Sequence, residues 1–113
     1  MIEKIILDYL TGLGVKAYME IPEGVTVPPY CVIERTGGGG DEPGLNKALI
    51  VIKSYGVSLF KAAVLNELVK SYMEDIAALP EIASCDLNSD YNFTDTAKKQ
   101  YRYQAVYDLV YYD

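Results

Sequence analysis

With 113 residues, the chain fits one domain, residues 1–113, and can bury a single hydrophobic core. Half of its residues are hydrophobic, which argues against disorder, yet no apolar run approaches the ~20 residues that a membrane-spanning helix needs. The formal charge of −6 argues against a nucleic-acid binder, because such proteins use positive charge to neutralise phosphates.

The first third of the chain predicts one helix and two strands. Apolar residues at helical spacing predict a helix over residues 2–13. Alternating apolar and polar residues then predict a strand over residues 15–21. A loop over residues 22–29, rich in prolines that deny ladder hydrogen bonds, separates it from a second strand over residues 30–36.

The middle of the chain predicts a flexible loop, a central strand and a long helix. Residues 37–44 are rich in glycine and indicate a loop, whereas residues 46–54 are apolar on both faces and indicate a central strand. Ser58 is expected to cap a helix that runs to about residue 79, where Pro80 stops it. The stripe of this helix that is expected in the core comprises Leu65, Leu68, Val69, Tyr72, Ile76 and Leu79.

Two strands close the chain, over residues 81–93 and 100–112, with a polar turn over residues 94–99. Together the elements predict an α+β fold: a mainly antiparallel sheet of about five strands with two helices packed on one face, in the order α-β-β-β-α-β-β. Cys31 and Cys85 lie in strand-like segments and are expected to be buried, reduced thiols.

The last two strands present aromatic residues on defined faces. In the strand over residues 81–93, one face is expected to carry Ala83, Cys85, Leu87, Tyr91 and Phe93. In the last strand, the face expected to meet the core or a helix carries Tyr101, Tyr103, Ala105, Tyr107, Leu109 and Tyr111. The other face is also partly apolar, which favours contact with a partner, although tyrosines suit strands and tolerate exposure in a monomer as well.

Motifs for chemistry are weak in this sequence. Without histidine, the commonest general base and metal ligand are missing, and we expect no catalytic residue, metal or cofactor. The glycines at residues 37–40 lack the Lys-Ser/Thr ending and the following helix of a phosphate loop. Asp86, Asn88 and Asp90 resemble the start of a calcium loop without its later Gly and Glu, and are more simply the wet face of a strand.

Three stretches resemble the phage tail terminator family, also called tail completion proteins. They are residues 30–38 after a proline pair, residues 50–56 running into the long helix, and residues 100–104, where Gln-Tyr-Arg-Tyr-Gln opens the last strand. With the opening helix, the resemblance covers nearly the whole chain. Head-completion and other joining proteins of similar size are the alternatives that the resemblance leaves open.

The resemblance implies a structural virion protein of a phage or prophage, assembled in the bacterial host cytoplasm. Such proteins close a ring, commonly of six copies, on the finished tail tube and join the tail to the head. The implied partners are copies of itself, the tail tube protein and the head–tail connector protein, while DNA passes through without specific binding and no membrane is involved. No catalytic residue is implied.

A ring needs an interface between two different surfaces of the same subunit. For this interface we expect the glycine-rich segment and the outer face of the last strand. The residues are Gly37, Gly38, Gly39, Gly40, Asp41, Glu42, Arg102, Gln104 and Tyr112. The alternative function is a small adaptor that binds another protein or single-stranded nucleic acid, the latter by stacking on Tyr101 and Tyr103 beside the basic Lys98, Lys99 and Arg102.

Overall fold

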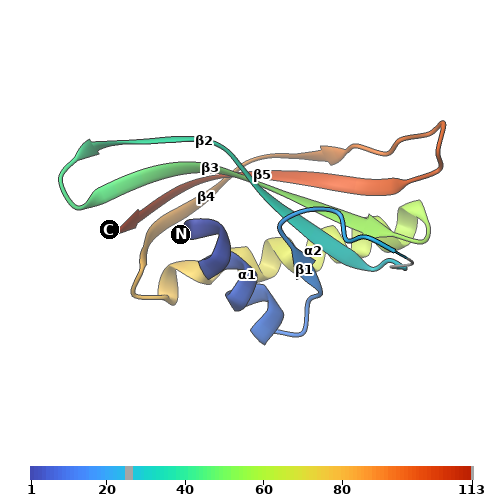
Figure 1. Ribbon diagram of the computed structural model, residues 1–113, viewed down its shortest axis with the longest axis horizontal. Helices are drawn as coiled ribbons and strands as arrows, with labels where there is room; N and C mark the ends of the chain where they lie inside the picture. Colours follow the sequence, from blue (N-terminus) through green and yellow to red (C-terminus); the bar gives the residue numbers. More distant parts are fainter. Residues whose placement is uncertain (25–26, 113) are drawn as a thin grey trace.

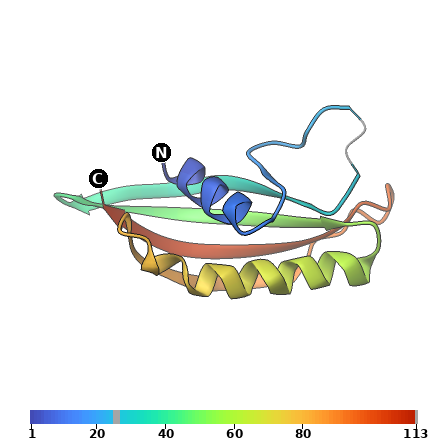
Figure 2. The same cartoon turned by 90° about the horizontal axis from the view of Figure 1, so that it is seen from below.

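The computed structural model describes residues 1–24 and 27–112, and the side chain of Asp41 lies outside the described part. The chain forms one sheet of five strands with both helices on the same face, as Figures 1 and 2 show from two directions. The elements are α1 (Ile2–Gly12), β1 (Ala17–Tyr18), β2 (Tyr30–Glu42), β3 (Leu45–Gly56), α2 (Leu59–Glu74), a 3-10 turn η1 (Ile76–Ala78), β4 (Ile82–Asn92) and β5 (Tyr101–Tyr112). The predicted α+β fold and its element order are confirmed.

The strands lie in the order β1-β2-β3-β5-β4, and every neighbouring pair is antiparallel except β1 with β2. β3 is central, as its two apolar faces predict, because β2 and β5 pair with it on either side. The strands are long for so small a domain, and the molecule measures 45 × 25 × 24 Å. Both ends of the long axis are formed by strand connections.

The main core lies between the sheet and the two helices. α1 covers β1 and β2, while α2 lies along β3 and β5, and the hydroxyl of Tyr9 on α1 donates to the carbonyl of Tyr72 on α2 over 2.7 Å. The residues of this core include Ile2, Ile6, Leu10, Cys31, Ile33, Ile50, Ile52, Leu65, Val69, Met73, Tyr107 and Leu109. The aromatic face of β5 that was expected to meet the helices does so at Tyr107 and Tyr111.

The long helix begins as predicted, with the Ser58 hydroxyl accepting from the Lys61 amide at 3.2 Å. It ends at Glu74, earlier than expected, and the segment up to residue 79 continues as the 3-10 turn η1. Leu68 was expected in the core but is 42% exposed. The buried face is instead centred on Ala62, Leu65, Asn66, Val69 and Met73, so that Leu68 falls outside it.

The largest correction concerns the glycine-rich segment. Residues 37–42 form the second half of β2, paired with β3, and are not a loop. The turn is formed by Pro43 and Gly44 alone, with Gly44 in the left-handed region at φ 83°. The glycine-rich composition predicted a loop, because glycine is rare in strands. In this strand some glycines are required by close contact: a Cβ on Gly38 would lie 2.5 Å from the Lys47 carbonyl oxygen.

Two further strands differ from the sequence pattern. The strand expected over residues 15–21 is reduced to Ala17–Tyr18, which pairs with Cys31 and Val32. β4 contains two register shifts, one before Ser84 and one before Ser89. The second shift moves Tyr91 to the face opposite Cys85 and Leu87, contrary to the strict alternation expected.

The face of the sheet away from the helices, called the open face here, has its own small core. It consists of Tyr30, Val32 and Tyr55, with Tyr18 packed against them. Tyr30 is 5% and Tyr55 2% exposed although no helix covers them, because their rings stack on each other at 4.9 Å between centroids. These two tyrosines of the open face are therefore buried within the subunit. None of the described helices is long and apolar enough to cross a membrane.

Candidate interaction surfaces

Two different surfaces lie at opposite ends of the long axis. One is the tip of the β2–β3 hairpin, residues 42–45, with Tyr112 beside it; this is called the hairpin end. The other contains the β4–β5 turn, residues 93–100, and the start of α2; this is called the turn end. Figures 1 and 2 both show the two ends pointing away from each other, so that one chain cannot bring its own two ends together.

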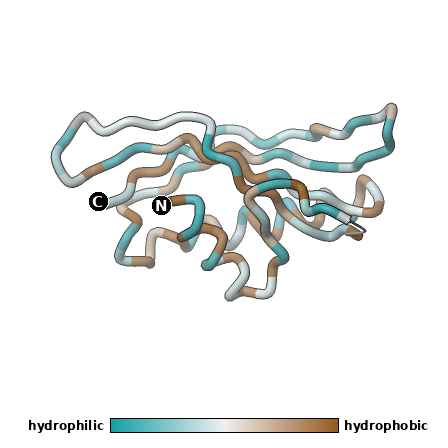
Figure 3. The backbone as a smooth tube through the Cα atoms, viewed as in Figure 1, coloured by the Kyte–Doolittle hydropathy of each residue, from teal (hydrophilic) through white to brown (hydrophobic). Residues whose placement is uncertain are grey.

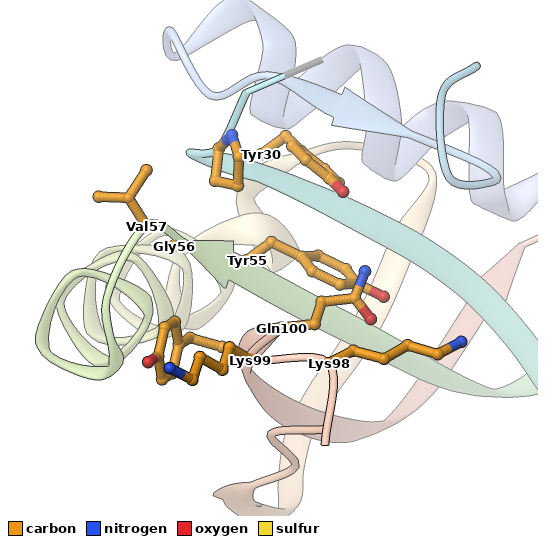
Figure 4. A pocket seen from close by; sticks show the side chains of 9 residues that line it. Tyr30, Tyr55, Gly56, Val57, Lys98, Lys99 and Gln100 are labelled. Carbon is orange, nitrogen blue, oxygen red and sulfur yellow. The ribbon is translucent and has the colours of Figure 1, made fainter. Parts of the chain in front are cut away.

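The turn end holds a pocket of about 440 Å³, called the tyrosine–lysine pocket. It is lined by Pro28, Tyr30, Tyr55, Gly56, Val57, Lys98, Lys99, Gln100 and Tyr101. Figure 4 shows the hydroxyls of Tyr30 and Tyr55 pointing the same way, with the side chain of Lys98 extending in that direction as well. Residues from three separate segments of the chain thus meet at one site.

The stacking of Tyr30 on Tyr55 determines what this pocket can bind. Since the two rings are nearly parallel, with 19° between their planes, and are almost fully buried, their faces are occupied by each other. Only their edges and hydroxyls are left to a ligand. Burial, followed by the neighbouring Tyr55 and Tyr18, raises the pKa of Tyr30, so its hydroxyl remains a donor at neutral pH. These two tyrosines therefore offer hydroxyl donors to an anion, and their rings are closed to a base.

The cations of the turn end are unusual in having no carboxylate partner. Lys98 and Lys99 are exposed, and neither they nor Lys61 on α2 forms an ion pair with any residue of the described chain. The turn itself is fixed: Asp95 and Gln100 exchange backbone hydrogen bonds of 3.0 Å, and the Asp95 carboxylate accepts from the Lys98 amide at 3.1 Å. The two ammonium groups are therefore carried on an ordered turn. Figure 3 shows this turn as mostly hydrophilic and the middle of the central strand β3 as hydrophobic.

An apolar groove of about 300 Å³ adjoins this pocket along α2, and the two share Val57. Its lining includes Pro29, Val64 and Leu68. Nearby Phe60 is 72% exposed, although it is one of only two phenylalanines in the chain. Apolar side chains in such a row usually mark a contact surface.

The structure divides the predicted interface residues between the two ends. Gly37 to Glu42 and Tyr112 lie toward the hairpin end, where Tyr112 pairs with Leu45 and is 52% exposed. Asp41 belongs to this strand, but its side chain is outside the described part. Arg102 and Gln104 lie near the other end of the same face, opposite Tyr55 and Lys53. The residues that were predicted to form one interface therefore lie on two separate surfaces.

Arg102 and Gln104 are already engaged within the subunit. The Arg102 guanidinium donates to the Phe93 carbonyl at 2.7 Å and to Gln100 Oε1 at 2.9 Å, and it lies 4.6 Å from the centre of the Phe93 ring. Gln104 donates through Nε2 to the Tyr91 hydroxyl. Both residues hold the β4–β5 hairpin together and are less available to a partner than was expected.

The basic and aromatic residues considered for nucleic-acid binding do not form one platform. Tyr101 and Tyr103 lie on the helix face of β5, whereas Arg102 points to the open face, since neighbours in a strand alternate. Tyr101 still borders the tyrosine–lysine pocket with Lys98 and Lys99. Sequence reasoning singled out these lysines but missed Tyr30 and Tyr55 as their neighbours, because more than forty residues separate the two groups in the chain.

A partly buried polar network lies under α2, away from both ends. Asp90 on β4 accepts from Asn66 Nδ2 and from Lys70 Nζ, each at 2.6 Å, and Lys70 also pairs with Glu67. Burial raises the pKa of Asp90, but the hydrogen bonds from Lys70 and Asn66 outweigh it and hold the pKa below its usual value. Among the described residues, no group of His, Cys, Asp and Glu is arranged to hold a metal ion. We assign this network to stability.

A scan against protein-family models finds none that matches this chain, and a search of curated proteins finds no match.

Proposed function

We propose that this chain is a structural assembly protein of a phage or prophage, a tail terminator that oligomerises into a ring on the tail tube and joins tail to head. The observation that carries the proposal is the pair of unlike surfaces at opposite ends of the subunit. One end has three unpaired lysines, a donor-lined pocket and an apolar groove. The other presents an acidic hairpin tip and an exposed tyrosine.

Unlike surfaces favour head-to-tail association. When the two halves of an interface are different and far apart on one subunit, each copy can bind one neighbour through each half, and the assembly grows until rotation closes it into a ring. A two-fold dimer would instead use one self-complementary patch. The acidic balance of the chain also suits a protein through which DNA passes without adhering.

The first test of this proposal is the oligomeric state at high protein concentration. Native mass spectrometry and negative-stain microscopy are expected to show a discrete ring, six copies by the family resemblance. Because ring formation can require the tube, the same measurements should be repeated with tail tubes assembled from a tube protein encoded beside this chain. Rings at tube ends, and tubes that stop growing when the protein is added, are the expected results. A strict monomer in both settings would refute the proposal.

A second function, a protein-binding adaptor, is favoured by the groove along α2. Val57, Val64 and Leu68 line this groove and are exposed, as is Phe60 nearby on α2, and a partner's apolar segment could occupy the groove without any self-association. The adaptor function predicts a monomer at all concentrations that binds a different protein from the host or phage. Substitution of Phe60 would then abolish that binding.

A further inference from the structure

We infer that the tyrosine–lysine pocket of one subunit receives the acidic tip of the β2–β3 hairpin of the next copy, with the Glu42 carboxylate directed at Lys98. This inference rests on the proposed self-assembly and names the residues that would make its contact. The pocket and the tip are the two ends described above, so the contact can form only between copies.

The chemistry of the pocket specifies an anionic occupant. The Lys98 ammonium group and the hydroxyls of Tyr30 and Tyr55 are donors that point the same way in Figure 4, whereas Lys99 extends the other way, and none of the residues that line the pocket is acidic. A carboxylate accepts hydrogen bonds and supplies the missing negative charge. A nucleobase is a poorer fit, because the faces of Tyr30 and Tyr55 are stacked on each other and closed to a third ring.

The hairpin tip supplies that anion in a shape that can enter a pocket. Glu42 is exposed at the end of β2, preceded in sequence by Asp41, and the tight turn of Pro43 and Gly44 makes the tip narrow. Pairing with β3, which β5 supports on its other side, holds the tip in place. Because Glu42 pairs with Leu45, and Leu45 with Tyr112, the tip loses less conformational entropy on binding than a free loop would. A volume of about 440 Å³ is within the usual range of ligand pockets, ~300–1,000 Å³.

The experiment is a charge exchange across the interface. Lys98→Glu alone and Glu42→Lys alone are each expected to weaken self-association at least tenfold, measured by sedimentation over a concentration series at low salt. The chain that carries both substitutions is expected to return to within threefold of the wild type, because the pair is re-formed with its signs reversed. Lys16→Glu is the matched control, since Lys16 is an exposed, unpaired lysine outside the pocket, and it should change association less than threefold.

A second measurement detects the contact itself. Equal amounts of ¹⁴N- and ¹⁵N-labelled protein are mixed and treated with a carbodiimide, which joins carboxylates to amines only where they touch. Mixed-isotope peptides that join residues 41–42 to Lys98 or Lys99 are the expected products. Their formation should fall as salt is raised.

The outcomes separate this inference from the proposed function. If oligomers form but Lys98→Glu leaves them intact and the mixed-isotope peptides are missing, the hairpin contact is wrong and self-assembly stands. If both single variants weaken association and the double variant does not recover, the two residues do not meet and the inference is overturned. Lys98-dependent binding of a single-stranded oligonucleotide without self-association would assign the pocket to nucleic acid and overturn both.

Discussion

Replacing Gly56 by alanine is expected to destabilise the fold by about 1–3 kcal/mol. Gly56 is the last residue of β3 and is buried against the first turn of α2. A Cβ at this position would overlap the backbone nitrogen of Ala62 and lie 2.8 Å from the Ala62 Cα and from the Lys61 carbonyl carbon. All three are main-chain atoms, so no side-chain rotation can relieve the contact, and α2 must move away from the sheet.

For a chain of this length, 1 kcal/mol corresponds to about 4 °C in Tm, so Gly56→Ala should lower Tm by about 4–12 °C. The matched control is Gly39→Ala, because a Cβ on Gly39, also in a strand, meets nothing within 4 Å. That change should leave Tm the same or slightly higher, since alanine reduces the entropy of the unfolded chain. Thermal unfolding followed by circular dichroism measures both. A Gly56→Ala protein that melts within 1 °C of the wild type would refute the predicted packing of α2 on β3.

Three further predictions test the partly buried Asp90 network, the thiols and the apolar surface of α2. The pKa of Asp90 is lowered in the fold, so its contribution to stability is present above the unfolded pKa of about 4 and is lost as pH falls through the folded pKa. Asp90→Asn should therefore flatten the acid side of a curve of unfolding free energy against pH. An unchanged curve would contradict the pairing of Asp90 with Lys70. Cys31 is buried as expected, whereas Cys85 is only partly buried. Burial raises the pKa of Cys31 to about 11, and burial followed by the charge of Asp86 raises that of Cys85 to about 12. Both thiols should therefore react slowly with a thiol-specific reagent at pH 8, Cys31 the more slowly, until urea unfolds the chain; rapid labelling of Cys31 in the native protein would contradict its burial. Phe60→Ser should change the unfolding free energy by less than about 0.5 kcal/mol, as expected for a surface position. The same substitution should reduce self-association. A large loss of stability would show that Phe60 packs internally.

The sequence by itself determined the element types and their order. Helical spacing in residues 2–13, the Ser58 cap and the doubly apolar run of residues 46–54 each follow from short-range periodicity, and each is confirmed. The division of β5 into a helix face and an open face is confirmed for the same reason, since alternation in a strand without a register shift is a local property.

Only the tertiary structure decided where strands end, which glycines are extended and which residues meet. Residues 37–42 form a strand because β3 pairs with Gly37 to Gly39 and again with Glu42, across a register shift, and no local propensity could show this. The register shift before Ser89 moved Tyr91 to the other face, and pairing with β5 determines it. The tyrosine–lysine pocket joins Tyr30, Tyr55 and Lys98 from three distant segments, because the order of strands in the sheet brings them to one end. Spacing along a chain reports neighbours within one element, whereas a surface built from several elements exists only once the sheet has formed.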